Sequence, residues 1–195
     1  MNNRKAIIVS GPNGAGKTTF AKEYCAEHEL KYISADLIAE SLNPDDLQEV
    51  AIEAGRQYFK EVYQCIEKNE SFVVESTLSG ISFQKVIDSL KNQGYSISIV
   101  FVFLQTPESC IERIKERVRR QGHFVPDEDV IRRFYRSIRN FWKVYKNLAD
   151  RWYLICNSTN KFVEVAFGGK KDYSVSDERV FGNFLKIVEG PSERQ

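Results

Sequence analysis

Short, unbroken apolar runs alternate along the chain with longer segments whose apolar residues recur at helical spacing. An unbroken apolar run is typical of a parallel strand buried on both faces, because neither face then needs polar residues. Such runs predict five strands, at residues 6–10, 31–34, 72–74, 97–104 and 152–156. Because helical segments separate these strands, we expect a doubly wound, mostly parallel five-stranded α/β sheet.

The segments between the strands predict helices at residues 18–29, 46–68, 83–93, 108–120 and 127–150. The last of them has a continuous apolar stripe, and a break at 122–126 separates it from the helix before it. Beyond the fifth strand, two short runs flank Gly168-Gly169 and predict a β-hairpin, and Asp177 is expected to cap a final helix. We therefore expect one domain, residues 1–195, with the C-terminal hairpin and helix at about 160–188.

The first strand runs into a glycine-rich loop, where residues 11–18 read GPNGAGKT and match GxxxxGK[ST] at every fixed position. In such a loop the backbone N–H groups and the start of the following helix face phosphate groups. Lys17 is expected to reach the β- and γ-phosphates of ATP or GTP, and the Thr18 hydroxyl to bind Mg²⁺. The alternative is a glycine-rich turn with an unrelated lysine, which the preceding strand and following helix disfavour. The predicted nucleotide-binding residues here are Gly11, Asn13, Gly14, Ala15, Gly16, Lys17, Thr18 and Thr19.

Acidic and hydroxyl residues follow the second and third strands. Asp36 lies just past the second strand and is a candidate catalytic base for the hydroxyl of an acceptor molecule. Capping of a helix by Asp36 or Ser34 is the alternative. Glu75 ends the third strand and is a candidate for holding Mg²⁺ or the acceptor, with Thr77 as a neighbouring acceptor contact. The alternative for Glu75 is a solvent-exposed residue at a strand end.

Residues 113–146 contain eleven Lys and Arg against four acids, whereas the whole chain has a formal net charge of +1. A lid at about 113–135 explains this cluster, because arginines that close on the γ-phosphate neutralise the charge that develops during phosphoryl transfer. Most of the cations outside the lid candidates are interpreted as a solvated helix face, namely Arg136, Arg139, Lys143 and Lys146. His123 is a candidate for either a substrate contact or a structural hydrogen bond. The lid arginines that we expect at the site are Arg117 for nucleotide binding, and Arg120 and Arg133 for catalysis.

The overall composition, with 42% hydrophobic and 28% charged residues, is that of an ordinary globular protein. The N-terminus lacks the apolar length of a signal peptide, and no apolar run is long enough for a membrane span, so we expect a cytoplasmic protein. The cysteines are widely spaced and match no metal-ligand pattern, so they are expected to be free thiols; they are Cys25, Cys65, Cys110 and Cys156.

Five strings of residues resemble zeta-toxin-type P-loop kinases, and more specifically their short bacterial "predicted ATPase" branch. The strings are GPNGAGKTT at 11–19, SAD at 34–36, AGR at 54–56, ESTLSG at 75–80 and RVRRQGHFVP…VIRRF within 117–134. The resemblance runs in order over most of residues 5–160, and the last string is the most selective. The chain departs from the toxins in being shorter and in having Gln121 where relatives often have glycine.

Zeta toxins phosphorylate UDP-N-acetylglucosamine, so the resemblance implies ATP- and Mg²⁺-dependent transfer to a hydroxyl of a small molecule. A nucleotide sugar is the first candidate acceptor, and an antitoxin protein is the partner that the resemblance implies. The resemblance further implies that Lys17 and Thr18 bind ATP and Mg²⁺ and that Asp36 is the acceptor base. It also implies that Glu75 and Thr77 lie near the acceptor or the metal, and that Arg120 and Arg133 are lid arginines.

Two other functions stay open. An ATPase or nucleotide switch would hydrolyse ATP without stimulation by any acceptor. A nucleic-acid enzyme, such as a polynucleotide 5′-hydroxyl kinase, would use the basic segment as a phosphate track. Nucleic acid is disfavoured, because the aromatic residues of that segment fall on the apolar stripe of its helix, and because two carboxylates beside one phosphate loop repel a polyanionic end. Those aromatic residues are Phe134, Tyr135, Phe141 and Trp142.

Overall fold

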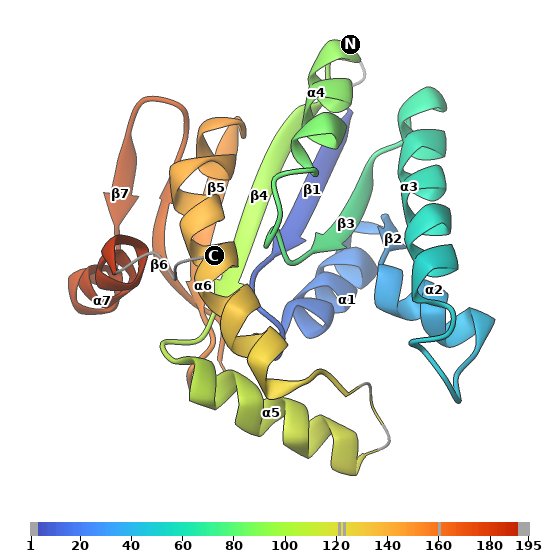
Figure 1. The fold of residues 1–195 in the computed structure, drawn as a ribbon. Helices are drawn as coiled ribbons and strands as arrows, with labels where there is room; N and C mark the ends of the chain where they lie inside the picture. Colours follow the sequence, from blue (N-terminus) through green and yellow to red (C-terminus); the bar gives the residue numbers. More distant parts are fainter. Residues whose placement is uncertain (1–3, 121, 123, 160, 191–195) are drawn as a thin grey trace.

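The computed structural model describes residues 4–120, 122, 124–159 and 161–190, which fold around one mixed sheet (Figure 1). Its strand order is β2-β3-β1-β4-β5-β6-β7. Neighbours among the first five strands of this order are parallel, whereas β6 pairs antiparallel with both β5 and β7. The strands are β1 Lys5–Ser10, β2 Lys31–Ile33, β3 Phe72–Ser76, β4 Ser96–Phe103, β5 Arg151–Cys156, β6 Val163–Gly168 and β7 Tyr173–Val175.

The predicted doubly wound, mostly parallel sheet is confirmed, and the structure adds one feature to it. The C-terminal hairpin of β6 and β7 continues the same sheet, so the sheet has seven strands over the described residues. Pairing β6 with β5 satisfies backbone groups that would otherwise form an open edge. A hairpin can be read from its turn, but which strand it joins is decided by tertiary packing.

The helices are α1 Lys17–His28, α2 Ala35–Leu42, α3 Ala51–Glu67, α4 Gln84–Asn92, α5 Pro107–Arg119, α6 Asp127–Lys143 and α7 Glu178–Glu189, with a 3₁₀ turn η1 at Tyr145–Asn147. Helix α2 was not predicted, and the helix expected from residue 46 begins later, at Ala51. Asn43 Oδ1 accepts from the N–H groups of Asp45 and Asp46, and Asp46 Oδ1 accepts from those of Gln48 and Glu49. These local bonds hold turns in place of helix.

The apolar core lies on both faces of the sheet, because side chains of one strand point alternately to opposite sides. In β1, Ile7 and Val9 belong to a small core that includes Ala21 of α1, whereas Ala6 and Ile8 belong to a larger core. The larger core includes residues of α3, α4, α6 and α7. The sheet therefore has α1 on one face and most other helices on the opposite face, as Figure 1 shows.

Aromatic side chains hold α6 and α7 against the sheet. The ring of Phe141 stacks on Phe101 of β4 at 4.3 Å between centroids, and Trp142 lies edge-on to Phe184 of α7 at 5.7 Å. Phe134 and Phe141 are fully buried. The apolar stripe of this helix thus packs into the core, as its spacing predicted, so these rings are not a surface for stacked bases.

Within the described residues, no helix is both long enough and apolar enough to span a bilayer.

Candidate functional site

The carboxyl ends of the central parallel strands meet at one edge of the sheet, which is the lower edge in Figure 1. The glycine-rich loop after β1, the start of α2, the end of β3 and the inner side of α5 together line a cavity of about 330 Å³ at this edge. We call it the loop cavity. Ligands of open α/β sheets bind at such strand ends, so the candidate site is built here.

The glycine-rich loop connects β1 to α1, and two of its glycines are required by their surroundings. Gly11 has a φ of +135°, and a Cβ there would lie 1.9 Å from the carbonyl oxygen of Val102 in β4. Gly16 has a φ of +98°, and a Cβ there would lie 2.5 Å from Nδ2 of Asn157. A side chain at either position would strain the backbone and collide with a neighbour, so the loop keeps its shape only with glycine.

Lys17, Thr18 and Glu75 form one cluster beside the loop. The Lys17 side chain is 7% exposed; its Nζ donates to the carbonyl oxygen of Pro12 at 3.1 Å and lies 3.7 Å from Glu75 Oε1. The Thr18 hydroxyl donates to Glu75 Oε2 at 3.0 Å. The Glu75 side chain is 9% exposed, so it faces the loop rather than solvent. The structure thus brings Glu75, singled out at the end of the third strand, to the two loop residues Lys17 and Thr18.

Two tyrosines fix the position of Glu75. The Tyr32 hydroxyl donates to Glu75 Oε2, and the Tyr58 hydroxyl donates to the backbone carbonyl of Glu75 at 2.9 Å. Burial is the main cause that raises the pKa of both phenols, and the nearby Glu75 charge adds to it. Both therefore stay protonated and act as donors at neutral pH.

Asp36 lies where three cavities meet. It lines the loop cavity and a second cavity of about 350 Å³, the hydroxyl cavity, which is lined by Ser34, Thr77, Ser79 and Ser82. It also lines a third cavity of about 270 Å³, the apolar cavity, between α2, α3 and residues 124–126. Within the described residues the Asp36 carboxylate makes no hydrogen bond or ion pair, and the Ser34 side chain does not cap α2. Capping by either side chain is therefore not seen.

Thr77 borders the hydroxyl cavity in a loop held from α6 and η1. Its hydroxyl oxygen lies 3.0 Å from that of Ser79. Asn140 Nδ2 donates to the carbonyl oxygen of Leu78 at 3.0 Å, and the Tyr145 hydroxyl donates to that of Gly80 at 2.6 Å. These bonds fix the loop, so its hydroxyls have a defined place beside Asp36.

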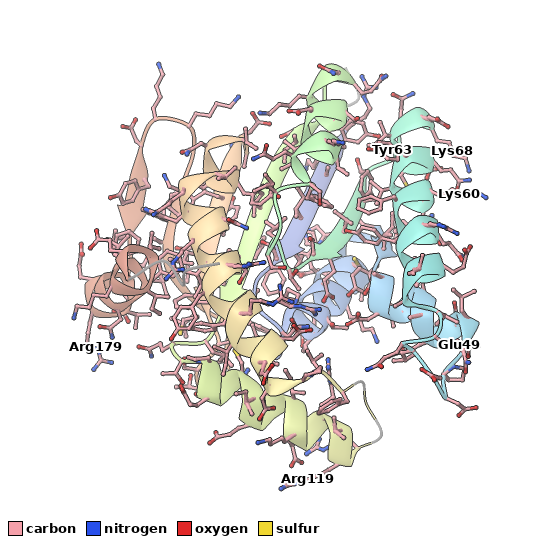
Figure 2. All side chains as sticks on the ribbon, viewed as in Figure 1. Glu49, Lys60, Tyr63, Lys68, Arg119 and Arg179 are labelled. Carbon is pink, nitrogen blue, oxygen red and sulfur yellow. The ribbon has the colours of Figure 1, made fainter. Side chains whose placement is uncertain are left out.

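The arginines predicted for a lid lie in different places. Arg117 lines the loop cavity, together with Arg113 one helical turn earlier on α5. Arg120 lines a wider adjoining cavity, and its Nη2 lies 3.0 Å from Glu116 Oε1. Arg119 points away from the molecule at the end of α5 (Figure 2), with a side chain that is 77% exposed.

Arg133 belongs to α6 rather than to α5. It lines both the hydroxyl and the apolar cavities, and its Nη2 lies 3.3 Å from Asp129 Oδ2. Arg132 also bonds Asp129, at 2.6 Å, and this hydrogen bond lowers the pKa of the Asp129 carboxyl. The ion pair with Asp129, one turn earlier on α6, thus holds Arg133 next to the hydroxyl cavity. His123 lies outside the described residues.

The end of α5 is shaped by Gly122. Its N–H donates to the carbonyl oxygen of Arg117 at 2.9 Å, as in a Schellman-type helix end. A Cβ at Gly122 would lie 2.5 Å from Cγ of Arg117. The glycine of the predicted break thus leaves room for an arginine that lines the loop cavity.

Two residues of the site, Tyr32 and Arg113, were not selected from the sequence, and a third, Asn157, was considered only as a residue of a loop that meets the nucleotide base. Asn157, just past β5, is buried, and its Nδ2 donates to the carbonyl oxygen of Ala15 at 2.9 Å, while its own carbonyl accepts from Arg113. This bridge connects α5 with the glycine-rich loop. Its only signal in the sequence is a polar residue just after an apolar strand, which many loops share.

The oxygen atoms near Thr18 fit the ligands of a magnesium ion. Mg²⁺ prefers oxygen ligands, and it is often held by one or two protein groups plus phosphate and water. The Thr18 hydroxyl and the Glu75 carboxylate are such oxygens, 3.0 Å apart. Asn13 lines the same wall, and its Oδ1 is buried without a hydrogen-bond partner among the described residues. A bound ligand would supply the partner that this atom lacks.

The sequence matches a known family. The model of the AAA domain family, AAA_33, matches residues 7–140. An uncharacterized protein of Haemophilus influenzae is 32% identical over 131 residues, which cover 67% of this chain and 92% of that protein. A cytidylate kinase of Sulfolobus acidocaldarius is 27% identical over 64% of this chain and 66% of its own length. A shikimate kinase of Staphylococcus aureus is 24% identical over 99% of both chains.

Solved structures share the fold at low sequence identity. The AvrRxo1-ORF1:AvrRxo1-ORF2 complex with ATP has a TM-score of 0.78 and 16% identity, over 99% of this chain and 66% of that chain. The PezAT toxin–antitoxin system of Streptococcus pneumoniae has a TM-score of 0.66 and 18% identity, over 100% of this chain and 82% of that chain. This chain spans about two thirds of the length of the AvrRxo1 chain and of the cytidylate kinase.

Proposed function

The chain belongs to the AAA domain family and has the fold of P-loop kinases, and from this premise we propose that it is a phosphotransferase acting on a small-molecule alcohol. It would transfer the γ-phosphoryl group of ATP or GTP, with Mg²⁺, to a hydroxyl of the acceptor. The observation that carries this proposal is that Asp36 lines both the loop cavity and the hydroxyl cavity.

The glycine-rich loop, Lys17 and Thr18 would bind the triphosphate. In support, the AvrRxo1 structure with the same fold holds ATP. Backbone N–H groups of the loop and the Lys17 ammonium offer positive charge to the β- and γ-phosphates. Arg113 and Arg117 would add charge from α5, because both line the loop cavity. Mg²⁺ would be bound by Thr18 and Glu75 and would offset charge on the phosphates.

The acceptor would bind in the hydroxyl cavity, with one hydroxyl directed at Asp36. The Asp36 carboxylate would take or orient the proton of that hydroxyl as its oxygen attacks the γ-phosphorus. Thr77 and its hydroxyl neighbours would hold the other polar groups of the acceptor. Arg133 would stabilise the charge of the transferring group from the acceptor side, and Arg120 from the side of the nucleotide.

A nucleotide sugar such as UDP-N-acetylglucosamine is the first acceptor to test, because the resemblance to zeta toxins points to it. An antitoxin partner is the matching proposal, supported by the fold of the PezAT system. Copurification of the chain with the product of a neighbouring small gene would test it.

The kinase proposal is tested by incubating the protein with labelled ATP, Mg²⁺ and a set of acceptors, and searching by mass spectrometry for a phosphorylated product. We expect Lys17→Ala to abolish transfer while the fold stays intact. Asp36→Asn should retain nucleotide affinity and lower turnover by about 10²-fold or more, as expected for a lost base.

Three results would contradict the proposal. Near wild-type transfer by Lys17→Ala would exclude the loop as the nucleotide site. ATP hydrolysis that no acceptor stimulates would favour a nucleotide switch. Label that reaches a 5′-hydroxyl RNA oligomer and no small molecule would favour a polynucleotide kinase.

A further inference from the structure

Gly55 lies inside α3 and lines the hydroxyl cavity. A Cβ at this position would meet no atom within 4 Å outside its chain neighbours and the backbone of its own helix. Its φ does not lie in the left-handed region, so the backbone does not require glycine here. Gly11 and Gly16 differ in both respects, because a Cβ at either would collide with a neighbour. Neither backbone conformation nor packing therefore accounts for Gly55.

A glycine at this position makes α3 less stable. Glycine has more conformational freedom to lose on folding than alanine, so it disfavours a helix when it stands in the interior. Gly55 is the fifth residue of the helix, which begins at Ala51 and ends at Glu67, so it is not part of a helix end. What the glycine provides instead is room, because the missing side chain widens the hydroxyl cavity.

The packing of α3 keeps this space open. Ala54 and Tyr58, on the buried face of the helix, are 2% and 5% exposed. The Tyr58 hydroxyl also donates to the backbone carbonyl of Glu75 at 2.9 Å, which ties the helix to the end of β3. The helix therefore cannot move toward the strand ends to fill the space beside Gly55 without losing these contacts.

Phe59 forms the next part of the same wall. It lies four residues after Gly55, so the two positions share one face of the helix, and Phe59 lines the same cavity. Helical side chains lean toward the N-terminus, so the 38% exposed ring covers the turn that begins at Gly55. Backbone N–H and C=O groups inside a helix bond one another. This wall therefore offers carbon atoms to a ligand.

A second glycine repeats the pattern in the loop after β3. Gly80 also lines the hydroxyl cavity, and a Cβ there would have one neighbour, Ser82 Oγ at 3.9 Å. The carbonyl oxygen of Gly80 accepts from the Tyr145 hydroxyl, so the loop is held in place. Two elements that are distant in the sequence thus both leave out a side chain at this cavity.

We propose that Gly55 is a specificity-determining residue: its missing side chain admits an acceptor whose carbon skeleton packs against α3 at Gly55 and Phe59. The inference rests on the proposed kinase function, since it concerns the molecule whose hydroxyl lies at Asp36. A side chain at position 55 would occupy part of the acceptor's space and displace its hydroxyl from Asp36. Both acceptor affinity and turnover would then fall.

The test is a size series at position 55 in the full chain, Gly55→Ala and Gly55→Leu. The acceptor probe is a protein-free extract of bacterial metabolites, incubated with γ-labelled ATP and Mg²⁺ over a series of dilutions. We expect Gly55→Ala to lower the yield of labelled product at limiting extract by about tenfold or more, the effect of one carbon that does not fit a pocket. Gly55→Leu should abolish the product.

Gly182→Ala and Gly182→Leu are the matched controls. Gly182 lies inside α7, a Cβ there would also meet nothing within 4 Å, and it lines none of the three cavities around Asp36. Both alanine variants should raise the midpoint of thermal unfolding by about 1–4 °C, because alanine favours a helix. Only the Gly55 variants should lose transfer. Titration with a fluorescent ATP analogue should give the wild-type affinity in all four.

Three results would overturn the inference while the proposed function stands. They are transfer by Gly55→Leu at the wild-type level, equal transfer by the Gly55 and Gly182 variants, and loss of nucleotide affinity or of thermal stability together with transfer in Gly55→Ala. If the wild-type chain itself labels nothing in the extract, the proposed function fails, and this inference fails with it.

Discussion

At the scale of single residues, Glu75 is the group on which most of the site's contacts converge. Its carboxylate accepts from Thr18 and Tyr32 and lies near Lys17, while its backbone carbonyl accepts from Tyr58. A carboxylate with these donors has one orientation, toward the phosphate loop. Since Glu75 is proposed to bind Mg²⁺, the groups that orient it should affect metal affinity although they would not touch the metal.

Substitution of the two tyrosines separates these contacts. Tyr32→Phe removes the donor to the Glu75 carboxylate and should weaken Mg²⁺-dependent nucleotide binding by about tenfold, the lower end of typical effects of such groups. Tyr58→Phe removes only the donor to the backbone carbonyl and should leave Mg²⁺ affinity nearly unchanged. Titration of Mg²⁺ against binding of a fluorescent ATP analogue measures both. Equal effects of the two variants would show that Tyr32 has only a structural role.

At the scale of elements, helix α5 presents its arginines to two different environments. Arg113 and Arg117 line the loop cavity, whereas Arg119 points outward and bonds Glu116. The helix is fixed at its start by Thr106, whose hydroxyl accepts from the N–H of Ser109, and at its end by Gly122. The same helix therefore contributes both a candidate binding face and a solvated face.

Alanine substitutions along α5 test this division. Arg120→Ala should lower turnover by about 10²-fold and affect nucleotide affinity less, because guanidinium groups bind the transferring phosphoryl group better than the resting one. Arg117→Ala should lower nucleotide affinity as well, because Arg117 lines the loop cavity. Arg119→Ala is the control and should be nearly silent, since an exposed ion pair contributes little. Steady-state kinetics and nucleotide titrations give the two quantities, and uniform small effects would mean that the whole helix is a solvated charge face.

At the scale of the whole molecule, the buried thiol and phenol groups determine the response to alkaline pH. Burial raises the pKa of Cys110 from 9.0 to about 12, partly offset by Lys17 and Arg113. Burial also raises the pKa of Tyr58 above its ordinary value of 10.0. Above these ordinary values, the unfolded chain releases protons that the folded chain retains. The unfolded state then binds fewer protons, so the free energy of unfolding falls as pH rises.

Denaturant unfolding at a series of pH values checks this expectation. The free energy of unfolding should be fully retained below about pH 9 and should fall above pH 10, by up to about 1.4 kcal/mol per pH unit for each such group. Tyr58→Phe removes one group and should make the fall less steep by up to that amount. A fall of unchanged steepness in this variant would contradict the raised pKa of Tyr58.

The sequence by itself determined the parallel sheet, the glycine-rich loop and the strand-end carboxylates, because these depend on local patterns. An apolar run, a glycine with left-handed φ and a residue that follows a strand can each be read over a few neighbouring positions. Tertiary structure decided the contacts between distant segments. Tyr32 meets Glu75, Asn157 meets Ala15, and the hairpin joins the edge of β5, each across a separation that no local pattern encodes. In the sequence, Arg113 is one of eleven cations in its segment. The orientation of α5 decides which arginines line the loop cavity, and this orientation depends on how the helix packs against the rest of the core.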